Sequence, residues 1–270
     1  MADLLVCRVH GDPTATALIY LPGIHGDWTL VTSFRLAVQR RVRFVEFCYP
    51  RTTEWSLGDH AQAIREALDR EGIRQGWLLA ESFGSQVAWA LLETQTASDS
   101  FRASGLILAG GFVRYPYPAL LTLATGLATR LPDSGLRAFL WLYARYARFR
   151  HRSAPETLEA VSEFVQRRLH PDDRGAIVHR LRLIAGSDPR PVAQACPLPT
   201  WSLTGFWDPI VPWVPMRRWL RRYCPGWRGD RILASADHTV LATQPVAAAR
   251  IILDWIDSEE GRDKVAKKMA

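Results

Sequence analysis

The chain has 270 residues, of which 48% are hydrophobic and 23% are charged, and its formal net charge is +7. This composition excludes a mainly disordered, collagen-like or coiled-coil protein, and no apolar run reaches the roughly 18 residues that a membrane-spanning helix needs. Arginines spread along the chain supply the positive charge, because the only lysines are Lys264, Lys267 and Lys268. Since no nucleic-acid-binding motif accompanies these arginines, we do not expect a nucleic-acid partner.

The N-terminus and the cysteines are typical of a cytoplasmic protein. The first ten residues include an acid and no long apolar stretch, so we expect no secretory leader. The chain lacks a CxxC pair, an HExxH motif and a glycine-rich nucleotide loop. We therefore expect no metal, no cofactor and reduced thiols. The thiols are those of Cys7, Cys48, Cys196 and Cys224.

The first 110 residues alternate short apolar runs with amphipathic stretches. Strands that alternate with helices predict an α/β fold with a mainly parallel sheet and helices on both of its faces. The expected strands are Leu4–Val9, Ala17–Leu21, Val42–Tyr49, Trp77–Ala80 and Ser104–Ala109. The expected helices are Asp27–Arg40, Leu57–Arg70 and Gln86–Glu93.

The alternation stops between Val113 and Pro191, where the pattern indicates helices alone: Leu120–Arg130, Leu136–Arg150, Glu156–Leu169 and Asp173–Ile184. It resumes with a strand at Thr200–Thr204, a helix at Val214–Arg222, a strand at Arg231–Ser235 and a helix at Pro245–Ile256. The sequence thus predicts an α/β core at 1–112 and 191–258, an inserted helical cap at 113–190, and a frayed, charged tail at 259–270.

Ser82 lies where an expected strand runs into an expected helix. Small residues, Ala80 and Gly84, stand two positions before and two positions after it. A serine on so tight a turn has a crowded backbone, and larger side chains at these positions would collide with it. The turn would hold the hydroxyl near the free N–H groups that begin the helix. Because a serine that only caps a helix has a similar pattern, Ser82 is a candidate nucleophile and the motif alone does not decide its role.

A nucleophilic serine needs a base, and the base needs an orienting acid. Of the seven histidines, His238 directly follows an expected strand, which places it where the carboxyl ends of parallel strands meet. Asp208 also follows an expected strand and is the candidate acid. Asp237 is the alternative acid, but adjacent residues in a loop rarely face each other. The sequence therefore favours Asp208.

Ser82, Asp208 and His238, each after a core strand and in this chain order, resemble the catalytic residues of the α/β-hydrolase superfamily. The resemblance covers residues 14–258, and the helical insertion lies where that family carries its cap. It implies that the backbone N–H groups of Ile24 and Phe83 stabilise an oxyanion. The chain departs from the usual family pattern by having Ala80 in place of a glycine, and Pro22 where a histidine is common. His25 is best interpreted as structural, with substrate contact as the alternative. The role of Glu81, next to Ser82, stays open, and a hydrogen bond to loop backbone is its simplest interpretation.

The resemblance implies hydrolysis of an ester, thioester, lactone or carbon–carbon bond through a covalent acyl-enzyme on Ser82. A serine at this position argues against the dehalogenase and epoxide-hydrolase branches of the family, because the resemblance implies an aspartate nucleophile in those enzymes. An acyltransferase with the same three residues and a non-enzymatic receptor or scaffold on the same fold are the alternatives.

The expected cap contributes two hypotheses about partners. Its leucines and aromatic residues favour a small-molecule substrate with a lipophilic acyl group, although the same residues also serve to pack the cap. The helix at 136–150, followed as far as residue 152, has one basic face. This face permits contact with an anionic membrane or an acidic partner. A solvated face is the favoured interpretation, and the oligomeric state stays open. The residues of that face are Arg137, Trp141, Arg145, Arg148 and Arg152.

Overall fold

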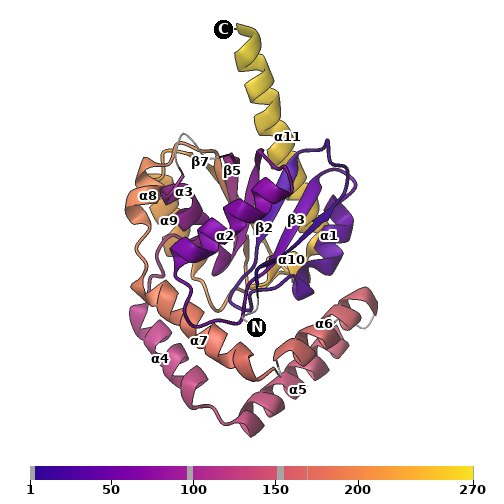
Figure 1. Ribbon diagram of the computed structural model, residues 1–270, viewed down its shortest axis with the longest axis vertical. Helices are drawn as coiled ribbons and strands as arrows, with labels where there is room; N and C mark the ends of the chain where they lie inside the picture. The colour runs from indigo at the N-terminus through magenta and orange to yellow at the C-terminus, as the bar shows by residue number, and fades with distance from the viewer. Residues whose placement is uncertain (1–3, 96–99, 151–154, 169, 270) are drawn as a thin grey trace.

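The computed structural model, which describes residues 4–95, 100–150, 155–168 and 170–269, is built around a seven-stranded sheet (Figure 1). The strand order is β1-β3-β2-β4-β5-β6-β7, in which β1 is antiparallel to β3 and every other pairing is parallel. The predicted α/β fold is therefore confirmed. The strands are β1 (Val6–His10), β2 (Ala17–Leu21), β3 (Arg43–Cys48), β4 (Gln75–Glu81), β5 (Arg102–Ala109), β6 (Thr200–Gly205) and β7 (Trp227–Leu233).

Helices cover both faces of the sheet because successive side chains of a buried strand point to opposite sides. Along β4, Leu78 and Ala80 belong to the apolar cluster under α2, α3, α8 and α9. Trp77 and Leu79 belong to the opposite cluster, under α1, α10 and α11. These helices are α1 (Thr32–Val38), α2 (Leu57–Arg70), α3 (Gly84–Glu93), α8 (Arg190–Ala195), α9 (Trp213–Tyr223), α10 (Val240–Thr243) and α11 (Pro245–Met269).

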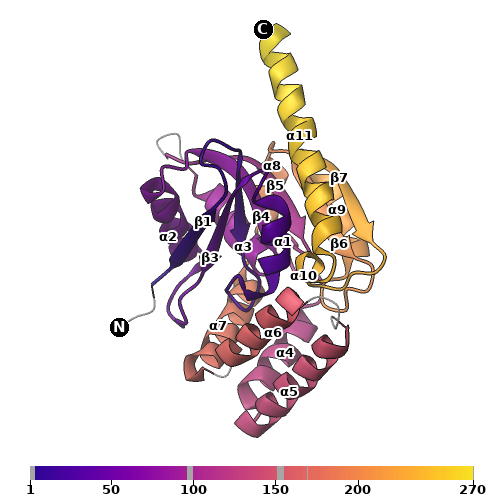
Figure 2. The ribbon, with the colours of Figure 1, turned by 90° about the vertical axis from the view of Figure 1, so that its right-hand side faces the viewer.

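Four further helices separate β5 from β6 in the sequence and lie together at one end of the sheet (Figures 1 and 2). We call them the cap helices. α4 packs against α7, and α5 packs against α6. The contacts of α6 and α7 with the loop after β2 place them at the carboxyl ends of the parallel strands. They are α4 (Pro118–Arg130), α5 (Asp133–Arg150), α6 (Pro155–Arg168) and α7 (Pro171–Gly186).

The helix expected at Asp27–Arg40 begins later than the sequence predicted. Asp27 lies in a loop, where its carboxylate accepts hydrogen bonds from the N–H and the hydroxyl of Thr29. This local turn competes with helix formation. A short 3₁₀ helix, η1 (Thr29–Val31), follows and leads into α1.

The last part of the chain differs from the prediction at four elements. β7 lies at Trp227–Leu233 and not at Arg231–Ser235, because it pairs with β6 from Thr200 to Gly205 despite its polar first half. The short helices α8 and α10 carried too few residues to show a periodicity. The helix expected to end at Ile256 continues to Met269, through the stretch where the sequence predicted a frayed tail, and α11 projects well beyond the sheet (Figure 2).

Among the described residues, no helix is long and apolar enough to cross a membrane.

Candidate functional site

Ser82 occupies a sharp turn between β4 and α3. Its φ of 49° lies in the left-handed region, and within the described parts of the chain no other non-glycine residue has a positive φ. Gly84 permits this turn, since a Cβ atom there would lie 2.1 Å from the carbonyl oxygen of Leu21. The N–H of Ser82 donates to the carbonyl of Ala109 at 3.2 Å, which ties the turn to the end of β5.

The structure brings the three sequence-predicted side chains into one hydrogen-bonded chain. His238 Nε2 lies 2.9 Å from Ser82 Oγ, and His238 Nδ1 lies 2.8 Å from Asp208 Oδ2. The carboxylate of Asp208 is fully buried, and its other oxygen accepts the N–H groups of Ile210 and Val211 at 2.8 and 2.9 Å. The Asp208 carboxylate can accept a hydrogen bond from Nδ1–H, and in that tautomer Nε2 is the acceptor for the serine hydroxyl.

Two glycines let the loops of this site approach each other. A Cβ atom on Gly110, whose φ is +56°, would lie 2.8 Å from the carbonyl oxygen of His238. A Cβ atom on Gly205 would lie 2.1 Å from the carbonyl oxygen of Asp237. The loop that carries His238 therefore rests directly on the ends of β5 and β6.

Asp237 does not face the imidazole. Its Oδ1 accepts the N–H and the hydroxyl of Thr239, each at 2.9 Å, and so closes a local turn. Of the two acids that the sequence left open, Asp208 is the one in contact with His238.

The two predicted oxyanion donors flank Ser82. Phe83 follows it directly, and the loop with Ile24 passes beside it, because a Cβ on Gly23 would lie 3.4 Å from Ser82 Cβ. Among the described residues, neither the N–H of Ile24 nor that of Phe83 has a hydrogen-bond acceptor. Both amides are thus free to donate to a negatively charged oxygen next to Ser82.

Glu81 and His25 are buried titratable groups beside the site. Burial raises the pKa of Glu81, whose carboxyl group accepts a hydrogen bond from the hydroxyl of Tyr20. Burial, together with nearby Arg168, lowers the pKa of His25 to about 3, so this imidazole is neutral. Its ring meets the edge of Phe164 from α6 with ring centres 4.7 Å apart. Sequence analysis missed the hydrogen bond to Tyr20, because nothing local indicates a contact across two strands.

Large apolar side chains are exposed on the loop that carries Asp208. Phe206, Trp207 and Ile210 are 49%, 69% and 51% exposed on the loop after β6. The hydroxyl of Tyr115, just before α4, donates to the carbonyl of Ile210 at 2.8 Å and joins this loop to the start of the cap helices. In the described chain, no group of three or more His, Cys, Asp or Glu residues is arranged to hold a metal ion.

Comparisons with known proteins give a consistent set of relatives, although no family model matches the chain. The chain is 30% identical, over 77% of its own length and 80% of the relative's, to a pimeloyl-[acyl-carrier protein] methyl ester esterase of Methylococcus capsulatus.

Solved structures share the fold at lower identity. A thermophilic esterase from Thermogutta terrifontis superposes with a TM-score of 0.73 at 20% identity, covering 94% of this chain and 93% of that one. An enol-lactonase from Burkholderia xenovorans superposes with a TM-score of 0.72 at 16% identity, covering 94% and 96%.

Proposed function

This chain belongs to the α/β-hydrolase family of ester-cleaving enzymes, and on that premise we propose that it hydrolyses its substrate through a covalent acyl-enzyme on Ser82. The observation that carries the proposal is the chain of short contacts from Ser82 through His238 to Asp208. A buried carboxylate, an imidazole and a serine hydroxyl on a tight turn, hydrogen-bonded in this order, are the parts that nucleophilic acyl transfer requires.

In the proposed reaction, Ser82 Oγ attacks the carbonyl carbon of the ester while His238 Nε2 takes the hydroxyl proton. The N–H groups of Ile24 and Phe83 bind the resulting oxyanion, and one such donor is typically worth about 3 kcal/mol of barrier. His238 then passes its proton to the leaving alcohol, and the acyl group stays on Ser82. A water molecule, deprotonated by His238, releases the acid in a second step of the same kind.

We propose a substrate with a lipophilic acyl chain. The exposed apolar side chains of Phe206, Trp207 and Ile210 beside Asp208 support this choice, since a lipophilic chain gains free energy by covering such surfaces. The relative from Methylococcus capsulatus is named for a methyl ester whose acyl group is borne by a carrier protein. A methyl ester on a carrier-borne acyl chain is therefore the first substrate to test, with free esters, thioesters and lactones as comparisons.

The test combines labelling with turnover. A fluorophosphonate probe should label the wild-type protein at Ser82, and Ser82→Ala should lose both labelling and ester hydrolysis. Ser104→Ala is the matched control, because Ser104 lies near the start of β5, at the opposite end of the strands from Ser82, and its hydroxyl accepts a hydrogen bond from the exposed Gln75. Full activity in Ser82→Ala would refute the mechanism, and absence of labelling in the wild type would favour a non-enzymatic receptor. An acyltransferase would label but would need an acceptor other than water.

A further inference from the structure

Two buried arginines of the cap helices bind the loop that carries Ile24. Arg180 of α7 is 2% exposed and donates to the carbonyl oxygens of Ile24 and Pro50, each at 3.0 Å. Among the described residues, no carboxylate lies within ion-pair distance of Arg180. Its guanidinium group thus donates its hydrogen bonds to backbone carbonyls of the core.

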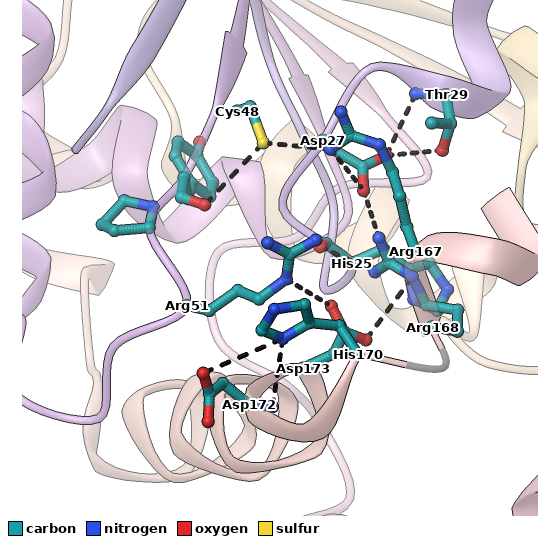
Figure 3. A network of polar contacts seen from close by, with 12 residues as sticks. His25, Asp27, Thr29, Cys48, Arg51, Arg167, Arg168, His170, Asp172 and Asp173 are labelled. Atoms are coloured by element: carbon teal, nitrogen blue, oxygen red, sulfur yellow. Dashed lines mark hydrogen bonds and ion pairs between the residues drawn. The ribbon is translucent and has the colours of Figure 1, made fainter. Parts of the chain in front are cut away.

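Arg168, at the end of α6, binds the next part of the same loop. Its side chain is 3% exposed, donates to the carbonyl of His25 at 2.8 Å and pairs with the carboxylate of Asp27. Asp173 at the start of α7 approaches the same guanidinium at 3.4 Å and also pairs with Arg51 of the core at 3.6 Å (Figure 3). Arg168 therefore lies at the centre of a buried ionic network between the cap helices and the core.

The loop fits closely against these side chains. Gly26 has a φ of +76°, and a Cβ atom there would lie 2.5 Å from Arg180 Nη1. The N–H of Gly26 donates to the carbonyl of Gly23 at 2.9 Å. The carbonyls of Ile24 and His25 instead depend on the two arginines. Without them, these part-buried carbonyls would lose their donors, and the loop would have to turn its peptide groups to find others.

We propose that Arg180 and Arg168 are positioning residues that fix the Ile24–Asp27 loop, so that the N–H of Ile24 points at the oxyanion. This inference rests on the proposed function, because it needs an oxyanion next to Ser82. The cap helices then contribute to the geometry of the active site. Their docking onto the core sets the geometry of one oxyanion donor and hence the rate of acylation.

The experiment compares Arg180→Gln, Arg180→Lys and Arg168→Lys with Arg182→Gln as the matched control. Arg182 is exposed on the same helix α7. Arg168→Lys keeps a charge beside Asp27 but cannot bind both Asp27 and the His25 carbonyl in the same way. Each variant is first checked for cooperative unfolding. Hydrolysis of a small p-nitrophenyl ester is then measured, together with inhibition by a trifluoromethyl ketone and by the matching methyl ketone.

For the three variants at Arg180 and Arg168, we expect kcat to fall about 10- to 100-fold, with KM changing less than threefold. Removal of an oxyanion donor typically lowers kcat 10²- to 10³-fold, and a donor that is only misplaced should cause part of that loss. The affinity for the trifluoromethyl ketone, which forms an oxyanion on Ser82, should fall in parallel. The affinity for the methyl ketone and all values for Arg182→Gln should not change. Arg180→Lys should retain more activity than Arg180→Gln, because it can still reach one carbonyl.

Two results would overturn the inference while leaving the proposed function intact. One is a kcat within twofold of the control in folded variants at Arg180 and Arg168. The other is that none of these variants folds while Arg182→Gln does, since the arginines would then hold the fold and not the loop. A wild-type protein that fluorophosphonate does not label would overturn both proposals, because no oxyanion would then form.

Discussion

At the scale of single residues, the backbone of Ser82 is held in a conformation that its side chain disfavours. A φ of 49° is a left-handed conformation, which costs an L-residue about 1–2 kcal/mol but costs glycine little. We expect Ser82→Gly to be more stable than Ser82→Ala by about 0.5–1 kcal/mol, after the greater freedom of glycine in the unfolded chain is subtracted. Urea unfolding of the two inactive variants measures this difference. Equal stabilities would mean that the turn is unstrained.

The two aspartates near His238 give a second prediction. Asp208→Asn replaces the carboxylate that accepts the hydrogen bond from Nδ1–H, so the imidazole adopts the wrong tautomer, and kcat should fall about 10³- to 10⁴-fold. Asp237→Asn alters only the turn with Thr239 and should cost less than about tenfold. Parallel kinetics, with unfolding curves for both variants, decide between the acids. A larger loss at Asp237 would contradict the assignment.

At the scale of elements, the sequence predicted what short stretches of chain determine. The strand β4 and the helix α3 on either side of Ser82 follow from apolar runs and small flanking residues. The edge strand β7 was misplaced because its pairing with β6, and not its own polar sequence, sets its position. The arginine contacts to the loop after β2 join residues more than 140 positions apart, and no local pattern indicates them.

Helix α2 carries a buried histidine that makes stability depend on pH. Burial lowers the pKa of His60 to about 4. Its Nδ1 donates to the carbonyl of Ser56 at 2.8 Å, and its ring packs edge-on against Tyr49, Trp55 and Phe83. Between pH 6.5 and about 4, the unfolded chain binds a proton at this residue and the folded chain does not. The free energy of unfolding should therefore fall as the pH falls through this range, by up to roughly 3 kcal/mol.

Urea unfolding between pH 7.5 and 4.5 checks this expectation. His60→Phe fills the aromatic site without a titratable group, so its free energy of unfolding should fall less steeply as the pH falls. At pH 7.5 this variant should be less stable than the wild type, because it lacks the hydrogen bond to Ser56. His170→Gln is the control, because His170 is exposed at the start of α7. Buried His25, with a pKa of about 3, should cause part of the slope that remains. An unchanged slope in His60→Phe would refute the role of His60.

At the scale of the whole molecule, positive charge gathers on the cap helices as well as on the core. Arg130, Arg137 and Arg145 are exposed there. Trp141 is 60% exposed, and the guanidinium of Arg145 lies 5.7 Å from its ring centre. The other members of the predicted basic face, Arg148 and Arg152, lie outside the residues whose side chains the structure describes. An acidic carrier protein would be attracted to this surface, whereas a small neutral ester would not.

Salt should therefore separate the two kinds of substrate. Between about 50 and 300 mM NaCl, kcat/KM for an ester on an acidic carrier should fall about tenfold, because screening weakens long-range attraction. The same salt should change hydrolysis of a small p-nitrophenyl ester less than twofold. Arg137→Glu combined with Arg145→Glu should lower only the carrier-dependent rate. Arg40→Glu is the control, because Arg40 is exposed on the core between α1 and β3. Sedimentation with anionic vesicles at low salt tests the membrane alternative. Binding to the vesicles that is lost when Arg137 and Arg145 are replaced would favour it. Equal salt dependence for both esters would show that these arginines form a merely solvated face.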